Sequence, residues 1–218
     1  MKKFLLFFSL LISFNLFSQP VIHWQNSIGG SNGDAAFVVK QTFDNGYILG
    51  GISNSNISGD KTENCRGAID FWIVKIDSLG LVEWDKTIGG SADDDLFSLE
   101  QTADSGYIMG GRTYSGISGD KTDSSRGVTD YWVVKVDANG NILWQKTIGG
   151  NDDDGLTCIS LSSDGGYLLM GGSATQYASG DKTLDSAGVW LVKLDSNGNI
   201  LWQKNYYRSR VCMYSTNG

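Results

Sequence analysis

The sequence predicts an all-β protein, a β-propeller-like array of about three four-stranded antiparallel blades. Three observations carry this prediction: a repeat of about 60 residues, an excess of turn-forming residues, and one strongly apolar segment in each repeat. The chain has 29 Gly, and its 24 acidic residues include only three Glu. Because Glu favours helices whereas Asp favours turns and caps, this composition argues against a helical bundle.

The internal repeat is visible along almost the whole chain. Trp24, Trp84, Trp144 and Trp202 follow one another at intervals of 60, 60 and 58 residues. We place one inserted residue near Met170 and three missing residues before Trp190 to explain the shorter last interval. Repetition of four short strands per unit is typical of propeller blades.

The elements follow in order. A lone strand is expected at residues 21–28, followed by repeats at 29–88, 89–148 and 149–204. In the second repeat the strands are expected at about 95–102, 106–112, 130–137 and 141–148. β-Branched and aromatic residues dominate these segments, and Gly, Asp and Asn separate them. The third strand is apolar on both faces, which indicates burial between stacked sheets. The repeated Trp of the fourth strand is expected to fill the gap between neighbouring blades.

The first and last predicted strands are of the same type, so neither supplies what the other lacks to close a ring. We therefore expect an incomplete, open propeller. An open end exposes a blade face, which favours self-association.

The repeated pattern is Trp, Gly-Gly, Asp-(Asn/Ser/Gly)-Gly-Tyr, Gly-Asp-Lys-Thr and Trp-(Ile/Val/Leu)-Val-Lys. It resembles the roughly 60-residue propeller repeats of secreted bacterial proteins, many of which end in a type IX sorting domain. The Asp-x-Asn-Gly-Asn-Ile-Leu-Trp segments also resemble blades of pyrroloquinoline-quinone dehydrogenases. The first resemblance implies a secreted propeller. Residues 205–218 depart from the repeat, and we expect a divergent, poorly ordered tail there.

Residues 1–18 read as a signal peptide, with Lys2 and Lys3 before an apolar run and Ser18 at a cleavage point. The expected location is secreted, extracellular or cell-surface, with the periplasm as an alternative. No membrane span is expected after signal removal. The net charge of −7 argues against nucleic acid as a partner.

Two groups of residues are candidate sites. The first is the Gly-Asp-Lys-Thr loop between the second and third strands, a polar surface for an extracellular protein or glycan. Its members are Asp60, Lys61, Thr62, Asp120, Lys121, Thr122, Asp181, Lys182 and Thr183. The alternative is a self-satisfied turn with a solvated lysine. The second group is a pair of acidic runs, either calcium ligands or solvated turns. Its members are Asp93, Asp94, Asp95, Asp152, Asp153 and Asp154.

Enzyme signatures are sparse. His23 is the single histidine, and Cys65, Cys158 and Cys212 form no metal-binding pattern. Most Asp residues recur at equivalent repeat positions, which favours a role in turns over catalysis. We therefore expect no catalytic residues and no cofactor other than calcium. The predicted function is a non-enzymatic binding or interaction module, in a truncated chain. The alternatives are a fragment of a carbohydrate-active hydrolase of propeller form and a non-functional truncation product.

Overall fold

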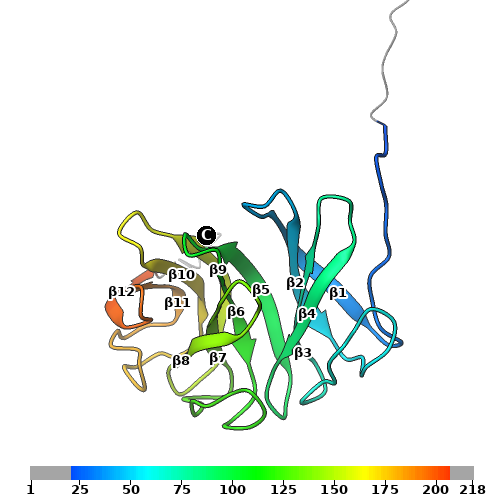
Figure 1. Ribbon diagram of the computed structural model, residues 1–218. Helices are drawn as coiled ribbons and strands as arrows, with labels where there is room; N and C mark the ends of the chain where they lie inside the picture. Colours follow the sequence, from blue (N-terminus) through cyan, green and yellow to red (C-terminus); the bar gives the residue numbers. More distant parts are fainter. Residues whose placement is uncertain (1–20, 207–218) are drawn as a thin grey trace, which may run out of the picture.

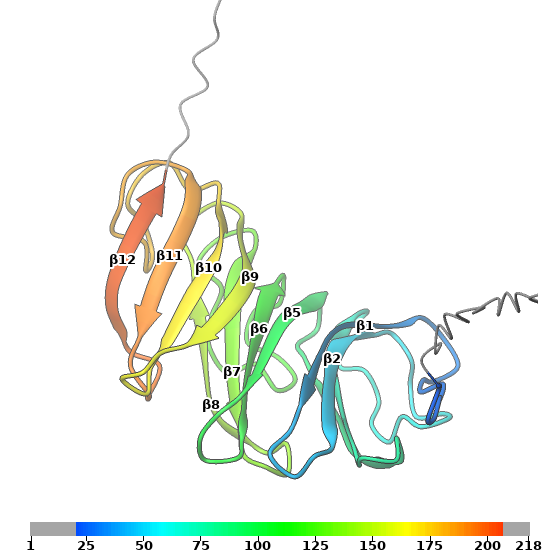
Figure 2. The ribbon, with the colours of Figure 1, turned by 90° about the horizontal axis from the view of Figure 1, so that it is seen from above.

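The computed structural model describes residues 21–206, which form three antiparallel sheets side by side (Figures 1 and 2). The expected signal peptide and the tail beyond residue 206 lie outside the described residues. Asn205 and Tyr206 were expected to begin that tail, but they belong to the last strand. No helix in residues 21–206 is long and apolar enough to cross a membrane.

Each sheet is a blade of four sequential strands. Blade 1 contains β1 (Asp34–Gln41), β2 (Tyr47–Ser53), β3 (Asp70–Ile76) and β4 (Val82–Ile88). Blade 2 contains β5 (Asp94–Gln101), β6 (Tyr107–Thr113), β7 (Asp130–Val136) and β8 (Ile142–Ile148). Blade 3 contains β9 (Asp154–Leu161), β10 (Tyr167–Ser173), β11 (Gly188–Leu194) and β12 (Ile200–Tyr206). The predicted all-β array of three four-stranded blades is therefore confirmed.

The cores lie between the blades. Every residue of β7 is buried, as expected for a strand that is apolar on both faces. We call the face that carries Trp72, Trp132 and Trp190 the front of its blade, and the opposite face the back. The front of blade 2 packs on the back of blade 1, where the rings of Trp132 and Phe71 lie 4.9 Å apart. Blade 3 meets blade 2 in the same way, since β9 and β6 are in contact and Trp190 lies against Tyr131.

The predicted lone strand at residues 21–28 is wrong. The segment has no ladder partner among the described residues, because no third strand of a preceding blade lies beside it. It instead covers part of the front of blade 1. The ring of Trp24 lies edge-on to Tyr47, and the Asn26 amide donates a hydrogen bond to the Gly80 carbonyl at 3.1 Å.

The insertion in the third repeat also differs from the prediction. Met170 pairs with Leu191 and Cys158, as Gly110 pairs with Val133 and Ser98. Met170 is therefore the counterpart of Gly110 and not an inserted residue. The extra residue lies in the loop after Ser173, because a loop accepts an insertion without disturbing strand register.

Candidate functional site

The three Gly-Asp-Lys-Thr loops turn their lysines inward. Lys61, Lys121 and Lys182 are at most 2% exposed. The Lys121 ammonium donates to Thr147 Oγ1 at 2.7 Å, and Lys182 donates to the carbonyls of Thr175 and Ser186. Burial lowers the pKa of all three lysines. These ammonium groups tie the loop to its own blade, so they are neither presented to an external ligand nor solvated.

The aspartates of these loops join successive segments of the chain. Asp60, Asp120 and Asp181 each accept a hydrogen bond from the first Gly of the nearby Gly-Gly pair. Asp120 and Asp181 also form ion pairs across the blade boundary, with Arg66 at 3.0 Å and Arg126 at 2.9 Å. Only the threonines of this candidate site are exposed: Thr62, Thr122 and Thr183.

The first acidic run does not converge on a common point. Asp94 is fully buried and accepts hydrogen bonds from the Gly90 amide at 2.6 Å and the Ser115 hydroxyl at 3.0 Å. Its neighbour Asp95 forms an ion pair with Arg112 at 2.8 Å. Asp93 is half-buried, and its carbonyl accepts from the Tyr114 amide.

The second acidic run is similar. Asp154 is fully buried on the Gly150 amide at 2.6 Å, Asp153 accepts from the Thr129 hydroxyl, and Asp152 is exposed. Within residues 21–206 no three His, Cys, Asp or Glu side chains gather as a metal site. Within these runs, the fully buried carboxylates accept hydrogen bonds from backbone amides, and two of the others contact an arginine or a threonine side chain.

Burial gives Asp94 an unusual acidity. It raises the pKa of this carboxyl to about 6, and the charge of nearby Asp70 across the blade boundary adds to the rise. Asp154, in the equivalent position, also has its pKa raised by burial. One oxygen of each of these carboxyls lacks a hydrogen-bond partner among the described residues. The groups are closed to substrate, so their shifted acidity reflects packing.

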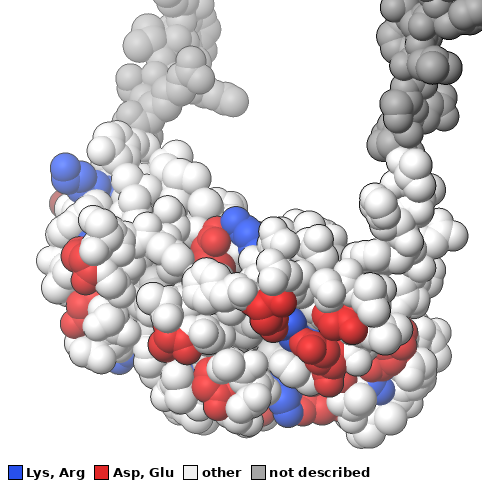
Figure 3. All heavy atoms as spheres, turned by 45° about the horizontal axis from the view of Figure 1, so that its top comes forward, with Lys and Arg blue, Asp and Glu red and all other residues white. Residues whose placement is uncertain are grey.

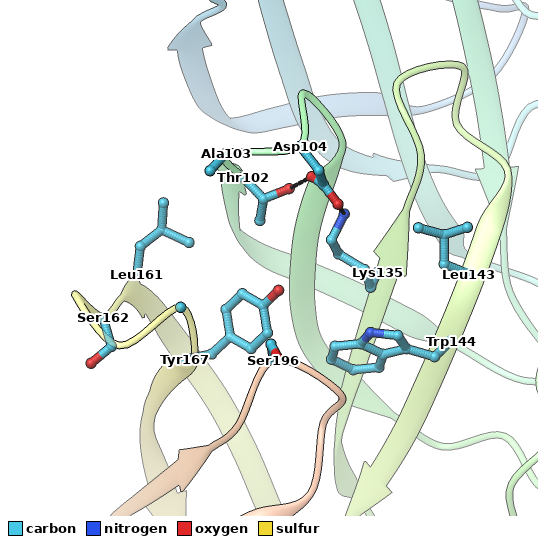
Figure 4. A pocket seen from close by; sticks show the side chains of 12 residues that line it. Thr102, Ala103, Asp104, Lys135, Leu143, Trp144, Leu161, Ser162, Tyr167 and Ser196 are labelled. Atoms are coloured by element: carbon cyan, nitrogen blue, oxygen red, sulfur yellow. Dashed lines mark hydrogen bonds and ion pairs between the residues drawn. The ribbon is translucent and has the colours of Figure 1, made fainter.

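A groove of about 330 Å³ lies between blades 2 and 3, at the end that carries the β5–β6 and β7–β8 turns (Figure 4). Trp144 and Tyr167 form its inner wall, with ring centroids 5.9 Å apart. Leu143 and Leu161 provide exposed apolar edges, 57% and 45% accessible. An aromatic and aliphatic lining with a few polar groups is typical of a binding site.

The charged groups of this groove form an ion pair between Asp104 and Lys135, at 2.9 Å. Asp104 also accepts from the Thr102 hydroxyl and the Gly106 amide. These hydrogen bonds and the Lys135 ammonium lower the pKa of Asp104 to about 2, although partial burial opposes them. Asp104 is the one carboxylate in the lining, so the groove offers a fixed charge and no acid–base pair.

A related groove of about 600 Å³ lies between blades 1 and 2. It is built from Trp84, Tyr107, Lys75 and Asp44, in the same repeat positions, with the added carboxylate of Glu83. Sequence reasoning missed both grooves. The available sequence signal was the lysine that follows Trp-x-Val in the third strand of each blade. In blades 1 and 2 the side chain of this lysine is 4% exposed and forms an ion pair with an aspartate of the turn between the first and second strands.

A third hollow, of about 700 Å³, opens between blades 2 and 3 near the inner strands. The Arg112 guanidinium lies over the rings of Phe97 and Tyr114, at 5.8 and 5.5 Å from their centroids. Acidic side chains are more numerous than basic ones on the face seen in Figure 3. The surface thus combines aromatic grooves with scattered charges, some of which form ion pairs.

No family model matches the chain. The chain is similar to the regulatory protein FlaEY of Caulobacter vibrioides, with 26% identity over 166 residues. The match covers 70% of this chain and 17% of FlaEY, so the chain spans less than a fifth of that protein's length.

Proposed function

We propose that this chain is a secreted or cell-surface binding module without catalytic activity. Its ligand site is the groove between blades 2 and 3, and the ligand is an extracellular protein or glycan. The observation that carries the proposal is the lining of this groove, where Trp144, Leu143 and Leu161 surround one ion-paired carboxylate. Aromatic and aliphatic walls bind through apolar contact, and a fixed charge pair orients the ligand.

The carboxylates support binding over hydrolysis. A glycosidase of the usual kind needs two carboxyl groups that face one substrate, one of them with a raised pKa. Asp94 has a raised pKa but is fully buried, whereas Asp104 lies in the groove with a lowered pKa. The two properties therefore fall on different residues in different places. FlaEY, which is similar to this chain over less than a fifth of its own length, is named as a regulatory protein.

The contacts of Trp84 with Tyr107, and of Trp144 with Tyr167, also support the proposal that these tryptophans dock successive blades.

The module proposed here needs no calcium, because carboxylates of its acidic runs already accept hydrogen bonds from backbone amides or pair with an arginine. Equal melting temperatures with calcium and with chelator are expected. A higher melting temperature with calcium would contradict this part of the proposal.

The test measures binding and hydrolysis together. The purified chain is applied to a glycan array and to a panel of extracellular bacterial proteins, and incubated with a β-glucan, a xylan and a mannan. We expect saturable binding to at least one probe and no release of reducing sugar. Release of reducing sugar by the chain would overturn the non-enzymatic function.

The site itself is tested with Leu143→Ser, which changes the exposed edge of the groove. We expect its dissociation constant for the bound probe to rise about tenfold, because an apolar contact at the edge of the groove is lost. The control is Ile117→Ser, which alters a residue that is 68% exposed on the opposite loop of the same blade. Equal affinities for the two variants would place the ligand elsewhere.

A further inference from the structure

Two apolar blade faces in the described chain lack a partner blade. On the back of blade 3, Val189 is 46% and Tyr206 is 56% exposed. Their counterparts on the backs of blades 1 and 2 are at most 3% exposed: Phe71, Ile88, Tyr131 and Ile148. On the front of blade 1, Val39 is 63% exposed, whereas its counterparts Leu99 and Ile159 are buried. Each open face therefore carries a surface that the same chain buries elsewhere.

The two internal interfaces share a detailed fit. A glycine on the second strand of each preceding blade receives two apolar side chains from the first strand of the next blade. Gly50 faces Leu96 and Leu99. A Cβ atom added to Gly50 would lie 3.0 Å from Leu96 Cδ2 and 3.1 Å from Leu99 Cδ1. Gly110 faces Leu156 and Ile159 in the same way, at 2.6 and 3.1 Å. Small residues on the back thus match large residues on the front.

On the two open faces the sizes are reversed, with a large residue on the back and small residues on the front. On the back of blade 3 the glycine position is filled by Met170, which is 42% exposed. On the front of blade 1 the two large positions are filled by Ala36 and Val39. Met170 adds as many side-chain atoms as Ala36 and Val39 lack relative to two leucines. The back of blade 3 and the front of blade 1 therefore conserve the total volume of a normal interface.

We propose that two copies of this chain dock front to back through these faces and close into a six-bladed ring. A front-to-back contact is heterologous, so it forms either a closed ring or an open filament. Closed propellers have about four to eight blades, and two is the one number of three-bladed copies that falls in this range. Ring closure uses both open faces of both copies, and the second contact forms at high effective concentration.

The segment at residues 21–28 must yield in this assembly. Within the chain, Trp84 lies on Gly140 and Tyr107, and Trp144 lies on Gly198 and Tyr167. Trp24 occupies the equivalent place on Gly80 and Tyr47 of blade 1. Trp202 is 42% exposed. In the ring, Trp202 of one copy replaces Trp24 on blade 1 of the other, and the segment acts as an intramolecular cap until then.

Sedimentation equilibrium on the full chain tests the assembly. We expect reversible dimers and no larger species up to about 100 µM chain. Met170→Glu should raise the dissociation constant at least about 100-fold, because it places a charge in the centre of an apolar interface. Ile117→Glu, on a loop away from both faces, should leave the constant unchanged. A wild-type monomer at the highest concentration, or open-ended polymers, would overturn the ring.

Mixing two variants tests the front-to-back geometry. Val39→Glu damages the front, and Met170→Glu damages the back, so each variant alone should be monomeric. Mixed together, they retain one native pair of faces and should form dimers that are weaker than wild type. Failure of the mixture to dimerise would contradict docking between these two faces. Melting temperatures equal to that of wild type, measured at a concentration where every chain is monomeric, will show that both variants fold, since both sites are exposed in the single chain.

The size match is tested by exchange. Ala36→Leu alone should weaken the dimer about tenfold by crowding Met170, and Met170→Gly alone should weaken it by leaving a void. Their combination should recover most of the lost affinity. Trp24→Ala should strengthen the dimer, because the place needed by Trp202 becomes free. Additive losses in the double variant would refute the match, and a weaker Trp24→Ala dimer would refute the cap. These readouts do not depend on the groove ligand proposed above.

Discussion

The backs of blades 2 and 3 have the same strand pattern in different surroundings. Tyr131 and Ile148 on blade 2 are 0% and 2% exposed, whereas Val189 and Tyr206 in the same positions on blade 3 are 46% and 56% exposed. The difference comes from the following blade, which covers the first face and not the second. The repeated strand pattern therefore produces blade faces that are complementary to one another. Each face becomes buried only where a neighbouring blade packs on it.

The largest expected effect comes from truncating an aromatic side chain on the covered face. Tyr131 packs on Trp190 at 5.1 Å between centroids, and its hydroxyl donates to the Trp190 carbonyl at 3.2 Å. Tyr131→Ala should lower the free energy of unfolding by about 3–5 kcal/mol. Val189→Ala, in the same position on blade 3, should cost less than about 1 kcal/mol. Urea unfolding at a concentration where the chain is monomeric measures both, and similar losses would contradict the comparison.

The second effect is a dependence on pH at the covered interface. The pKa of Asp94 is about 6 in the folded chain and near 3.8 when unfolded. Between about pH 4 and 6 the folded state holds the extra proton, so stability falls as pH rises through this window, by up to about 3 kcal/mol. Asp94→Asn should remove this fall. Urea unfolding from about pH 3.5 to 7.5 measures it, and a constant difference between variant and wild type would argue against the raised pKa.

Asp104, on the exposed turn end of the same blade, gives a contrast of opposite sign. Its lowered pKa, about 2, means that the folded state releases the proton more readily than the unfolded state. Its contribution to stability is present above about pH 4 and is lost as pH falls through about 2. Asp104→Asn should therefore lower the free energy of unfolding at neutral pH, and this loss should shrink towards acid pH. Asp94→Asn should instead raise the free energy of unfolding at neutral pH, and this gain should shrink towards acid pH. Urea unfolding extended down to about pH 2 distinguishes the two residues.

The third effect concerns the glycine position that blade 3 fills with a methionine. A Cβ at Gly110 would lie 2.6 Å from Leu156 Cδ2 and 2.7 Å from the Trp132 carbonyl oxygen. Gly110→Met should destabilise the monomer by about 1–3 kcal/mol through crowding. Met170→Gly should cost less than about 1 kcal/mol there, because it removes an exposed side chain from a strand. Thermal unfolding measures the loss of stability in each variant. Equal losses would mean that the interface between blades 2 and 3 accommodates a larger side chain at Gly110.

The strands could be predicted from the sequence because their signal is local. The aromatic and β-branched residues of β7, and the Gly and Asp residues in the turns between strands, can be recognised without knowledge of distant residues. The segment at 21–28 resembles the fourth strand of a blade, with Trp24 in place, yet it forms no ladder. Its sequence matches a strand, but a strand needs a neighbour, and that information is not in the segment itself.

The candidate site was less predictable, since it depends on contacts between repeats. Lys61 and its two counterparts look like solvent-facing loop residues, and only the structure shows their ammonium groups buried on carbonyls and hydroxyls. The groove at Trp144 arises where the turns of two blades approach each other. Asp137 has the expected turn role, because its carboxylate accepts from the nearby Asn139 amide. Asp60, Asp120 and Asp181 do not, since each accepts from a glycine amide 31 or 32 residues away.

The smallest expected effect is the loss of one hydrogen bond between blades. Ser98 on blade 2 is 8% exposed, and its hydroxyl accepts from the Ile159 amide of blade 3 at 2.9 Å. Ser98→Ala would leave that amide buried without its partner, at a cost of about 1 kcal/mol. Cys158 occupies the same position on blade 3 and is exposed, so Cys158→Ala should change stability by less than about 0.5 kcal/mol. Urea unfolding of the monomer resolves this gap. In the six-bladed ring the gap should narrow, because Cys158 would then lie in a covered interface like that of Ser98.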